Sequence, residues 1–164
     1  MSDQDTVVDS GTVVDAFAEF VTETGPRLKH ALMAALGADM GVEAASEALA
    51  YGWEHWDRVG QMENPGGYLY KVGRNWGRRC LRTRTRKLGF PVVSSEMPWV
   101  ETGLPGALSG LSERQRTAVV LVHGAGWSLA EVATLMGITR GAVHKHVERG
   151  LTKLRTSLEV DREN

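Results

Sequence analysis

Cationic side chains are concentrated in one short stretch of this 164-residue sequence. Residues 61–90 carry a net charge of +7, whereas residues 1–60 carry a net charge of −8. At helical spacing, one face of the basic stretch presents Lys71, Arg74, Asn75, Arg78 and Arg82. Such a stripe can bind phosphates without sequence specificity, and an asparagine held among cations suits the reading of an unpaired base. A solvated basic face is the alternative, but it would usually contain more neutralising acids.

A second basic helix is expected from Thr139 onward, and no acid stands at its N-terminal end. The residues that we expect to contact DNA from this helix are Thr139, Arg140, Gly141, His144, Lys145 and Arg149. The N-terminal ones would reach base edges, and Arg149 would meet a phosphate. The alternative is an αα-hairpin with a solvated basic face. A metal site at His144 and His146 is disfavoured, because helix residues two apart point about 200° from each other.

The sequence lacks the residue patterns that catalysis would need. It contains no glycine loop of the nucleotide-hydrolase type, no metal-binding Cys or His spacing and no nucleophile elbow. We therefore expect no enzymatic activity, no metal or other cofactor and no small-molecule substrate. The single cysteine, Cys80, fits a reducing compartment. With no signal peptide and no run of about 18 apolar residues, the sequence predicts a cytoplasmic protein without a membrane segment.

Helices must position these side chains, because apolar residues recur at spacings of three and four and no segment indicates a sheet. The expected helices cover about 13–21, 27–36 and 42–56, with a loop over 59–67 and a fourth helix from Tyr68 into the arginine cluster. The fourth helix should be buried along Leu69, Val72, Trp76 and Cys80. Residues 88–106 are rich in proline and glycine, which is typical of a linker. The predicted fold is all-α, with two small helical domains (13–87 and 107–158) joined by that flexible linker.

The second domain contains the signals of a helix-turn-helix. Ser112 with Gln115, and Ser128 with Glu131, have the spacing of capping boxes, in which each side chain satisfies the other residue's backbone N–H. Gly137 ends the short helix after the second box, and Thr139 caps the next helix. A short helix, a tight glycine turn and a longer basic helix together predict a DNA-binding helix-turn-helix.

Four blocks of the sequence, in this order, resemble an extracytoplasmic-function sigma factor of bacterial RNA polymerase. Residues 41–53 are similar to the family's core-binding helix, and residues 67–75 to the start of the helix that opens and reads the promoter −10 element. Residues 108–116 and 126–155 resemble the −35-binding domain. The chain departs from the family pattern at four positions. It has Tyr68 where the family has Trp, Ser46 where the family has Gln, Arg79 where the family has an acid, and Ala142 where the family has Thr.

The resemblance implies a role for each of these surfaces. The positions that would bind core polymerase are Glu43, Ser46 and Glu47. Those that would contact the −10 element are Asn64, Lys71, Arg74, Asn75, Arg78, Arg79 and Arg82, with Asn75 and the 61–67 loop holding a flipped base. The helix from Thr139 would read the −35 element. The implied partners are core RNA polymerase, promoter DNA and an inhibitory anti-sigma factor, the last of which the sequence itself does not show.

Two other classes of protein fit part of the sequence. A LuxR-like regulator would have a similar helix-turn-helix and would bind operators without polymerase, but its first domain should show strands or a ligand pocket. An adaptor whose basic helix binds an acidic protein would leave the helix-turn-helix unexplained. The all-helical first domain with its arginine-lined Asn75 favours a sigma factor that directs promoter recognition, DNA opening and transcription initiation.

Overall fold

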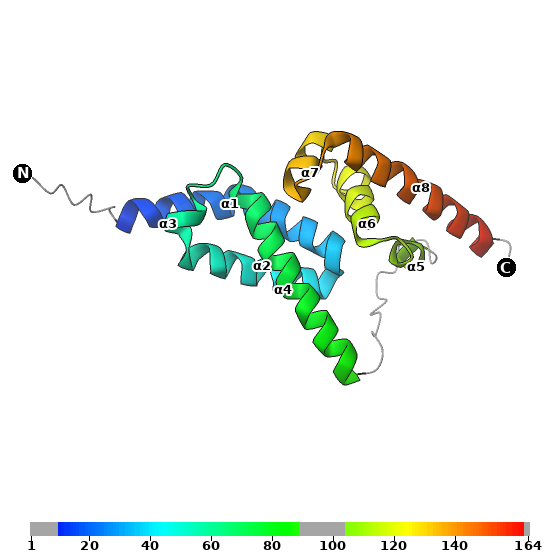
Figure 1. Cartoon of the computed structure of the whole chain (residues 1–164), viewed down its shortest axis with the longest axis horizontal. Coiled ribbons are helices and arrows are strands. Elements are labelled where there is room, and N and C mark those ends of the chain that lie inside the picture. Colours follow the sequence, from blue (N-terminus) through cyan, green and yellow to red (C-terminus); the bar gives the residue numbers. More distant parts are fainter. Residues whose placement is uncertain (1–9, 89–103, 163–164) are drawn as a thin grey trace, which may run out of the picture.

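The computed structural model describes residues 10–88 and 104–162, which form two helical modules (Figure 1). The first module consists of α1 (Ser10–Leu36), α2 (Ala38–Glu54), α3 (Trp56–Val59) and α4 (Pro65–Leu88). The second consists of α5 (Leu104–Ser109), α6 (Glu113–Val119), the π-helical turn η1 (Val120–Gly124), α7 (Leu129–Met136) and α8 (Arg140–Arg162). Neither described range contains a strand, so the predicted all-α class is confirmed. Of the linker predicted over 88–106, residues 89–103 lie outside the described residues.

α1 is one continuous helix where the sequence predicted two. Pro26 lies inside it and cannot donate a backbone hydrogen bond, a defect that costs about 3 kcal/mol in a helix interior. The turns after Pro26 bury Leu28 and Leu32 completely. Each buried leucine contributes about 1.5–3 kcal/mol. The predicted break between residues 21 and 27 is therefore wrong, because packing of the second half of α1 offsets the proline.

α2 folds back closely on α1 after a single residue, Gly37, whose φ of 90° is accessible mainly to glycine. The two backbones approach most closely at Gly41. A Cβ added there would lie 2.3 Å from the Cα of Met33, a distance that real Cβ atoms do not show. The absence of a side chain at Gly41 therefore sets the separation of α1 and α2, and with it the position of the exposed face of α2.

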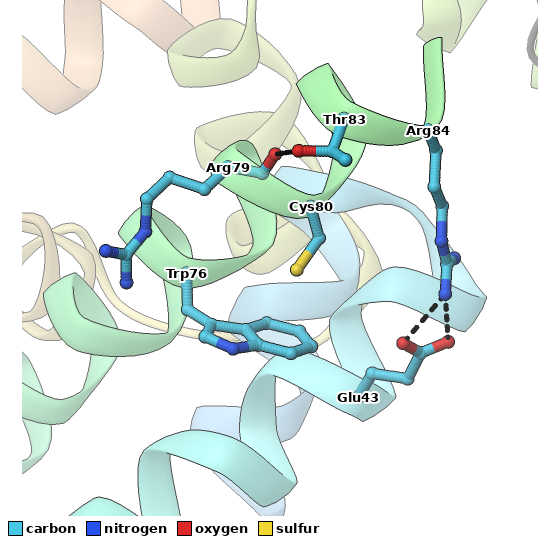
Figure 2. A pocket seen from close by; sticks show the side chains of 6 residues that line it. All are labelled: Glu43, Trp76, Arg79, Cys80, Thr83 and Arg84. Carbon is cyan, nitrogen blue, oxygen red and sulfur yellow. Dashed lines mark hydrogen bonds and ion pairs between the residues drawn. The ribbon is translucent and has the colours of Figure 1, made fainter. Parts of the chain in front are cut away.

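α4 packs against α2 along two glycines rather than along the whole of the predicted apolar stripe. Gly73 and Gly77 are buried, and a Cβ on Gly73 would lie 2.8 Å from the carbonyl oxygen of Ala44. Because α2 and α4 approach most closely at these two glycines, Trp76 and Cys80 lie at the edge of the contact between the helices and are only half-buried. They line an open pocket of about 530 Å³ between α2 and α4 (Figure 2). Leu69 is buried as predicted.

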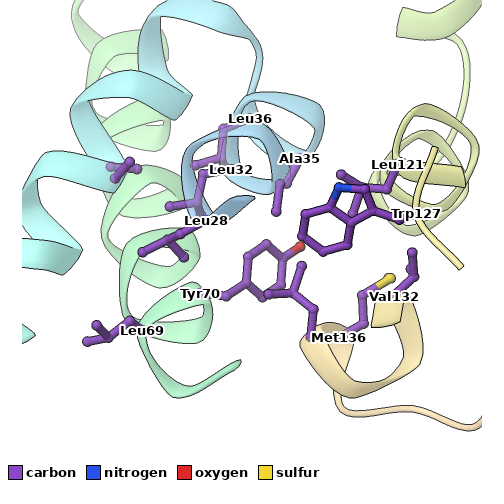
Figure 3. Packing of buried hydrophobic residues seen from close by; sticks show 14 of the residues in the cluster. Leu28, Leu32, Ala35, Leu36, Leu69, Tyr70, Leu121, Trp127, Val132 and Met136 are labelled. Atoms are coloured by element: carbon purple, nitrogen blue, oxygen red, sulfur yellow. The ribbon is translucent and has the colours of Figure 1, made fainter. Parts of the chain in front are cut away.

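One apolar cluster joins the two modules (Figure 3). The first module contributes Tyr70, which is 1% exposed, together with Leu28 and Leu32. The second contributes Leu121, Trp127, Val132 and Met136, all at most 9% exposed. A smaller cluster lies within the second module and consists of Ala107, Leu111, Val119 and Leu154. The modules therefore share a core in addition to the chain connection between them.

The helix-turn-helix forms as its local signals predicted. Both capping boxes are present, at Ser112 with Gln115 and at Ser128 with Glu131. Gly137 adopts the left-handed conformation (φ 65°) between α7 and α8. The side chain of Thr139 accepts a hydrogen bond from the Ala142 N–H at 3.1 Å and so caps α8. The caps fix the start of each helix, so the basic residues of α8 project from a rigid frame.

Candidate nucleic-acid interface

α4 begins earlier than the sequence predicted, because Asn64 caps it. The Asn64 Oδ1 accepts a hydrogen bond from the Gly67 N–H at 2.8 Å, and Pro65 takes the first helical position, where a missing N–H has no cost. The Asn64 Nδ2 donates to the carbonyl oxygen of Thr134 in α7 at 2.9 Å. Both the oxygen and the nitrogen of the Asn64 side chain are therefore hydrogen-bonded within the chain.

α2 and α4 form a second pocket, of about 410 Å³, on the basic side of α4. Its lining residues are Tyr51, Val72, Asn75, Arg78, Arg79 and Arg82. An aromatic ring, an amide and guanidinium groups are the features that hold an unstacked base and its phosphate. Four of the sequence-predicted residues come together here. Tyr51 was missed because it comes from α2, and no local pattern links it to Asn75.

The Tyr51 side chain is held in place from several sides. Arg58 donates a hydrogen bond to its hydroxyl at 2.7 Å, and the Tyr68 hydroxyl lies 3.2 Å away. Its ring stacks on that of His55, with centroids 4.2 Å apart and planes 12° from parallel. The hydrogen bond with Tyr51, followed by burial, raises the pKa of Tyr68, so the Tyr68 hydroxyl stays protonated at neutral pH. These contacts give the pocket a fixed aromatic wall.

The second module covers part of the basic face of α4. Glu113 of α6 accepts a hydrogen bond from Arg78 at 2.8 Å and lies 3.6 Å from the Nε of Arg74. The Lys71 ammonium lies beside Gly137, in the turn of the helix-turn-helix. Tyr70, one position before Lys71, is buried in the shared core. In contrast, Asn75, Arg79 and Arg82 are exposed.

The two modules are held together by further polar contacts. Arg116 of α6 donates to the carbonyl oxygens of Ala34 and Ala35, at 3.0 and 2.7 Å, near the C-terminal end of α1. Arg27 of α1 forms an ion pair with Glu131 of α7, and its guanidinium lies 4.5 Å from the centre of the Trp127 ring. The pairing with Arg27, and then the cap hydrogen bonds with Ser128, lower the pKa of Glu131 to about 2.

The N-terminal end of α8 is open to solvent. All six predicted residues are exposed: Thr139, Arg140, Gly141, His144, Lys145 and Arg149. His144 lies 3.5 Å from Glu148, one turn later on the same helix. His146 is half-buried, and burial lowers its pKa. In the described ranges, no three His, Cys, Asp or Glu residues gather closely enough to hold a metal ion.

The third predicted surface lies on α2, where Glu43, Ser46 and Glu47 are exposed. Arg84 of α4 donates to both carboxylate oxygens of Glu43, at 3.1 and 3.2 Å, across the pocket of Trp76 and Cys80 (Figure 2). Farther along α2, Trp53 is 48% exposed and packs against Phe17 of α1. The outer face of α2 thus combines acidic side chains with a large exposed aromatic residue.

Comparison with known proteins identifies the second module. Residues 107–156 match the model of the family described as Sigma-70, region 4. The chain is also 28% identical over 145 residues to the ECF RNA polymerase sigma factor SigL of Mycobacterium tuberculosis, a match that covers 80% of this chain and 81% of SigL. Over most of its length the chain is therefore similar to an extracytoplasmic-function sigma factor. Its second module is region 4, which favours a sigma factor over a LuxR-like regulator.

Solved structures support the fold of this chain. The sigma factor RpoE of Bartonella quintana, in complex with the anti-sigma factor NepR, matches with a TM-score of 0.62 and 22% identity, over 88% of this chain and 98% of RpoE. CnrH, in complex with the cytosolic domain of CnrY, matches with a TM-score of 0.57 and 18% identity, over 91% of this chain and 96% of CnrH. Within residues 10–88 and 104–162, no helix is long and apolar enough to cross a membrane.

Proposed function

We propose that this sigma factor binds core RNA polymerase, directs it to promoters with paired −10 and −35 elements, and helps to open the DNA. The observation that carries the proposal is the presence of two separate basic surfaces on one chain. One is the exposed start of α8 in region 4, and the other is the arginine-lined pocket of Asn75 on α4. Each suits a different form of DNA, duplex for α8 and unpaired strand for α4.

The −35 element would be read by α8 in the major groove. Arg140, His144 and Lys145 lie on exposed first turns, where side chains can reach base edges. Arg149 lies more than two turns into the helix and would meet a phosphate. The capped start of α8 at Thr139 holds these side chains in fixed register.

The −10 element would be held at the pocket between α2 and α4. A base flipped from the stack costs a few kcal/mol, so the pocket must supply compensating contacts. The Tyr51 ring would stack on the base, Asn75 would hydrogen-bond its edge, and Arg79 and Arg82 would hold the strand backbone. Asn64 would join this contact only after it leaves Thr134.

The polymerase would contact the outer face of α2 through Glu43, Ser46 and Glu47. Acidic residues there suit basic helices on a protein partner and would repel DNA. The protein would act in the cytoplasm without a cofactor and without chemistry of its own. RpoE was solved with the anti-sigma factor NepR and CnrH with the cytosolic domain of CnrY, and we propose an anti-sigma factor as a third partner of this chain.

The test is transcription by purified bacterial core polymerase on pooled genomic fragments from the source organism, with and without this protein. We expect discrete start sites that depend on the protein and are lost in Asn75→Ala and Arg140→Ala. Arg155→Ala is the matched control for Arg140→Ala, because it removes the same charge from an exposed position on the same helix. Specific DNA binding without polymerase, and no new start sites with it, would instead support the operator-binding regulator.

A further inference from the structure

Glu113 of region 4 lies between two of the arginines that we assign to the −10 strand. Its Oε2 accepts a hydrogen bond from the Nε of Arg78 at 2.8 Å, and its Oε1 lies 3.6 Å from the Nε of Arg74. The Glu113 side chain is 18% exposed and that of Arg74 is 21% exposed. A single carboxylate therefore faces two guanidinium groups, of which that of Arg74 is partly desolvated and that of Arg78 belongs to a side chain that is 47% exposed.

The fit of Glu113 to these arginines is incomplete. The Nε of Arg74 is buried and makes no hydrogen bond within the described residues, because the 3.6 Å separation from Glu113 exceeds hydrogen-bond distance. A carboxylate has two oxygens and cannot approach both guanidinium groups equally well here. A phosphate diester brings exposed anionic oxygens to the same position and can move to satisfy both arginines.

We propose that Glu113 occupies the place of a DNA phosphate on Arg74 and Arg78, so that region 4 and the −10 strand compete for the same arginines. The inference rests on the proposed function of α4. Closure of region 4 over α4 and binding of the strand backbone at these arginines are mutually exclusive. A single-stranded polyanion therefore opens the free chain as it binds.

The same geometry leaves the −35 surface available in the closed chain. The residues at the start of α8 are exposed while Arg74 and Arg78 are paired with Glu113. Duplex DNA can therefore be contacted by α8 before region 4 leaves α4. The contact of Asn64 with Thr134 must also break on opening, which releases a further candidate −10 residue in the same step.

The test compares Glu113→Gln with Glu131→Gln, using binding of fluorescein-labelled oligothymidylate to the full-length chain. Both variants remove one negative charge from region 4 at an ion pair with the first module, and glutamine keeps the shape of the side chain. Only Glu113 pairs with candidate DNA-binding arginines, since Glu131 pairs with Arg27. We expect Glu113→Gln to bind about three- to tenfold more tightly than the native chain, and Glu131→Gln to gain distinctly less.

Amide hydrogen exchange of the native chain supplies the second measurement. Addition of oligothymidylate should reduce the protection of α6 and α7, which pack on the first module, because the strand displaces them. Equal affinities for the two variants, or strand binding with unchanged protection of α6 and α7, would overturn the competition. Failure of all three chains to bind oligothymidylate would overturn the DNA assignment of α4 itself, and the competition with it.

Discussion

Replacing Arg116 with methionine should weaken the contact between region 4 and the first module. Methionine keeps most of the apolar stem but cannot donate to the carbonyl oxygens of Ala34 and Ala35. A hydrogen bond from a charged donor contributes about 1.5–3 kcal/mol. Both carbonyls regain water when the modules separate, so we expect about 2 kcal/mol for the pair. That free energy favours the separated form by roughly 30-fold.

Thermal unfolding and small-angle scattering measure this change. A loss of about 2 kcal/mol lowers the Tm of a chain of this size by about 4–8 °C, and the radius of gyration should rise as region 4 leaves α1. Arg114→Met is the matched control, because Arg114 lies on the same helix and is exposed. A surface change of that kind should stay within about 0.5 kcal/mol. If Arg116→Met matched the native chain in both Tm and radius of gyration, the reasoning would be refuted.

Three further changes test other parts of the structure. Gly41→Ala should destabilise the first module by about 3 kcal/mol in chemical denaturation, because the added Cβ meets the backbone of Met33. Gly141→Ala is the control and should have little effect on stability, because a Cβ added there meets nothing within 4 Å. Tyr51→Ala should shorten the lifetime of polymerase–promoter open complexes, because about 1–3 kcal/mol of base stacking is lost. Tyr51→Phe keeps the ring and should retain most of the lifetime. Equal lifetimes for the native chain and both variants would exclude Tyr51 from the base pocket. Because the pKa of Glu131 in the folded chain, about 2, lies below its usual value of 4.5, the ion pair with Arg27 stabilises the closed chain above pH 4.5 and is lost as the pH falls toward 2. The Tm of the native chain should therefore fall more steeply than that of Glu131→Gln over this range, and parallel curves would contradict the assignment.

Local signals in the sequence sufficed for the helix-turn-helix of the second module, but not for α5, which begins within the predicted linker. The capping boxes of α6 and α7 and the glycine turn before α8 depend on residues within a few positions of each other. Their side chains satisfy backbone groups whose positions the helix itself determines. For the same reason the exposed residues at the start of α8 could be named from the sequence. The basic stripe of α4 followed from charge and helical spacing alone.

Contacts between distant segments could not be predicted in this way. The burial of Tyr70 rather than Trp76 depends on the second module, which packs on the Tyr70 side of α4. The continuity of α1 through Pro26 depends on packing by both modules. Glu113 and Arg78 are separated by 35 residues in sequence, and nothing near either residue signals the ion pair. Tyr51 joins the pocket of Asn75 only because α2 and α4 pack side by side.

In the proposed mechanism, the chain closes with Arg74 and Arg78 paired to Glu113 and must open to direct transcription. In a Cys80→Ser background, Arg27→Cys and Glu131→Cys place thiols on either side of the closed contact, where a bismaleimide with a disulfide in its spacer can tether them. Transcription by core polymerase is then measured before and after the spacer is reduced. We expect no protein-dependent start sites from the tethered chain and their return on reduction. Initiation by the tethered chain at the same sites as the untethered one would show that opening is not required.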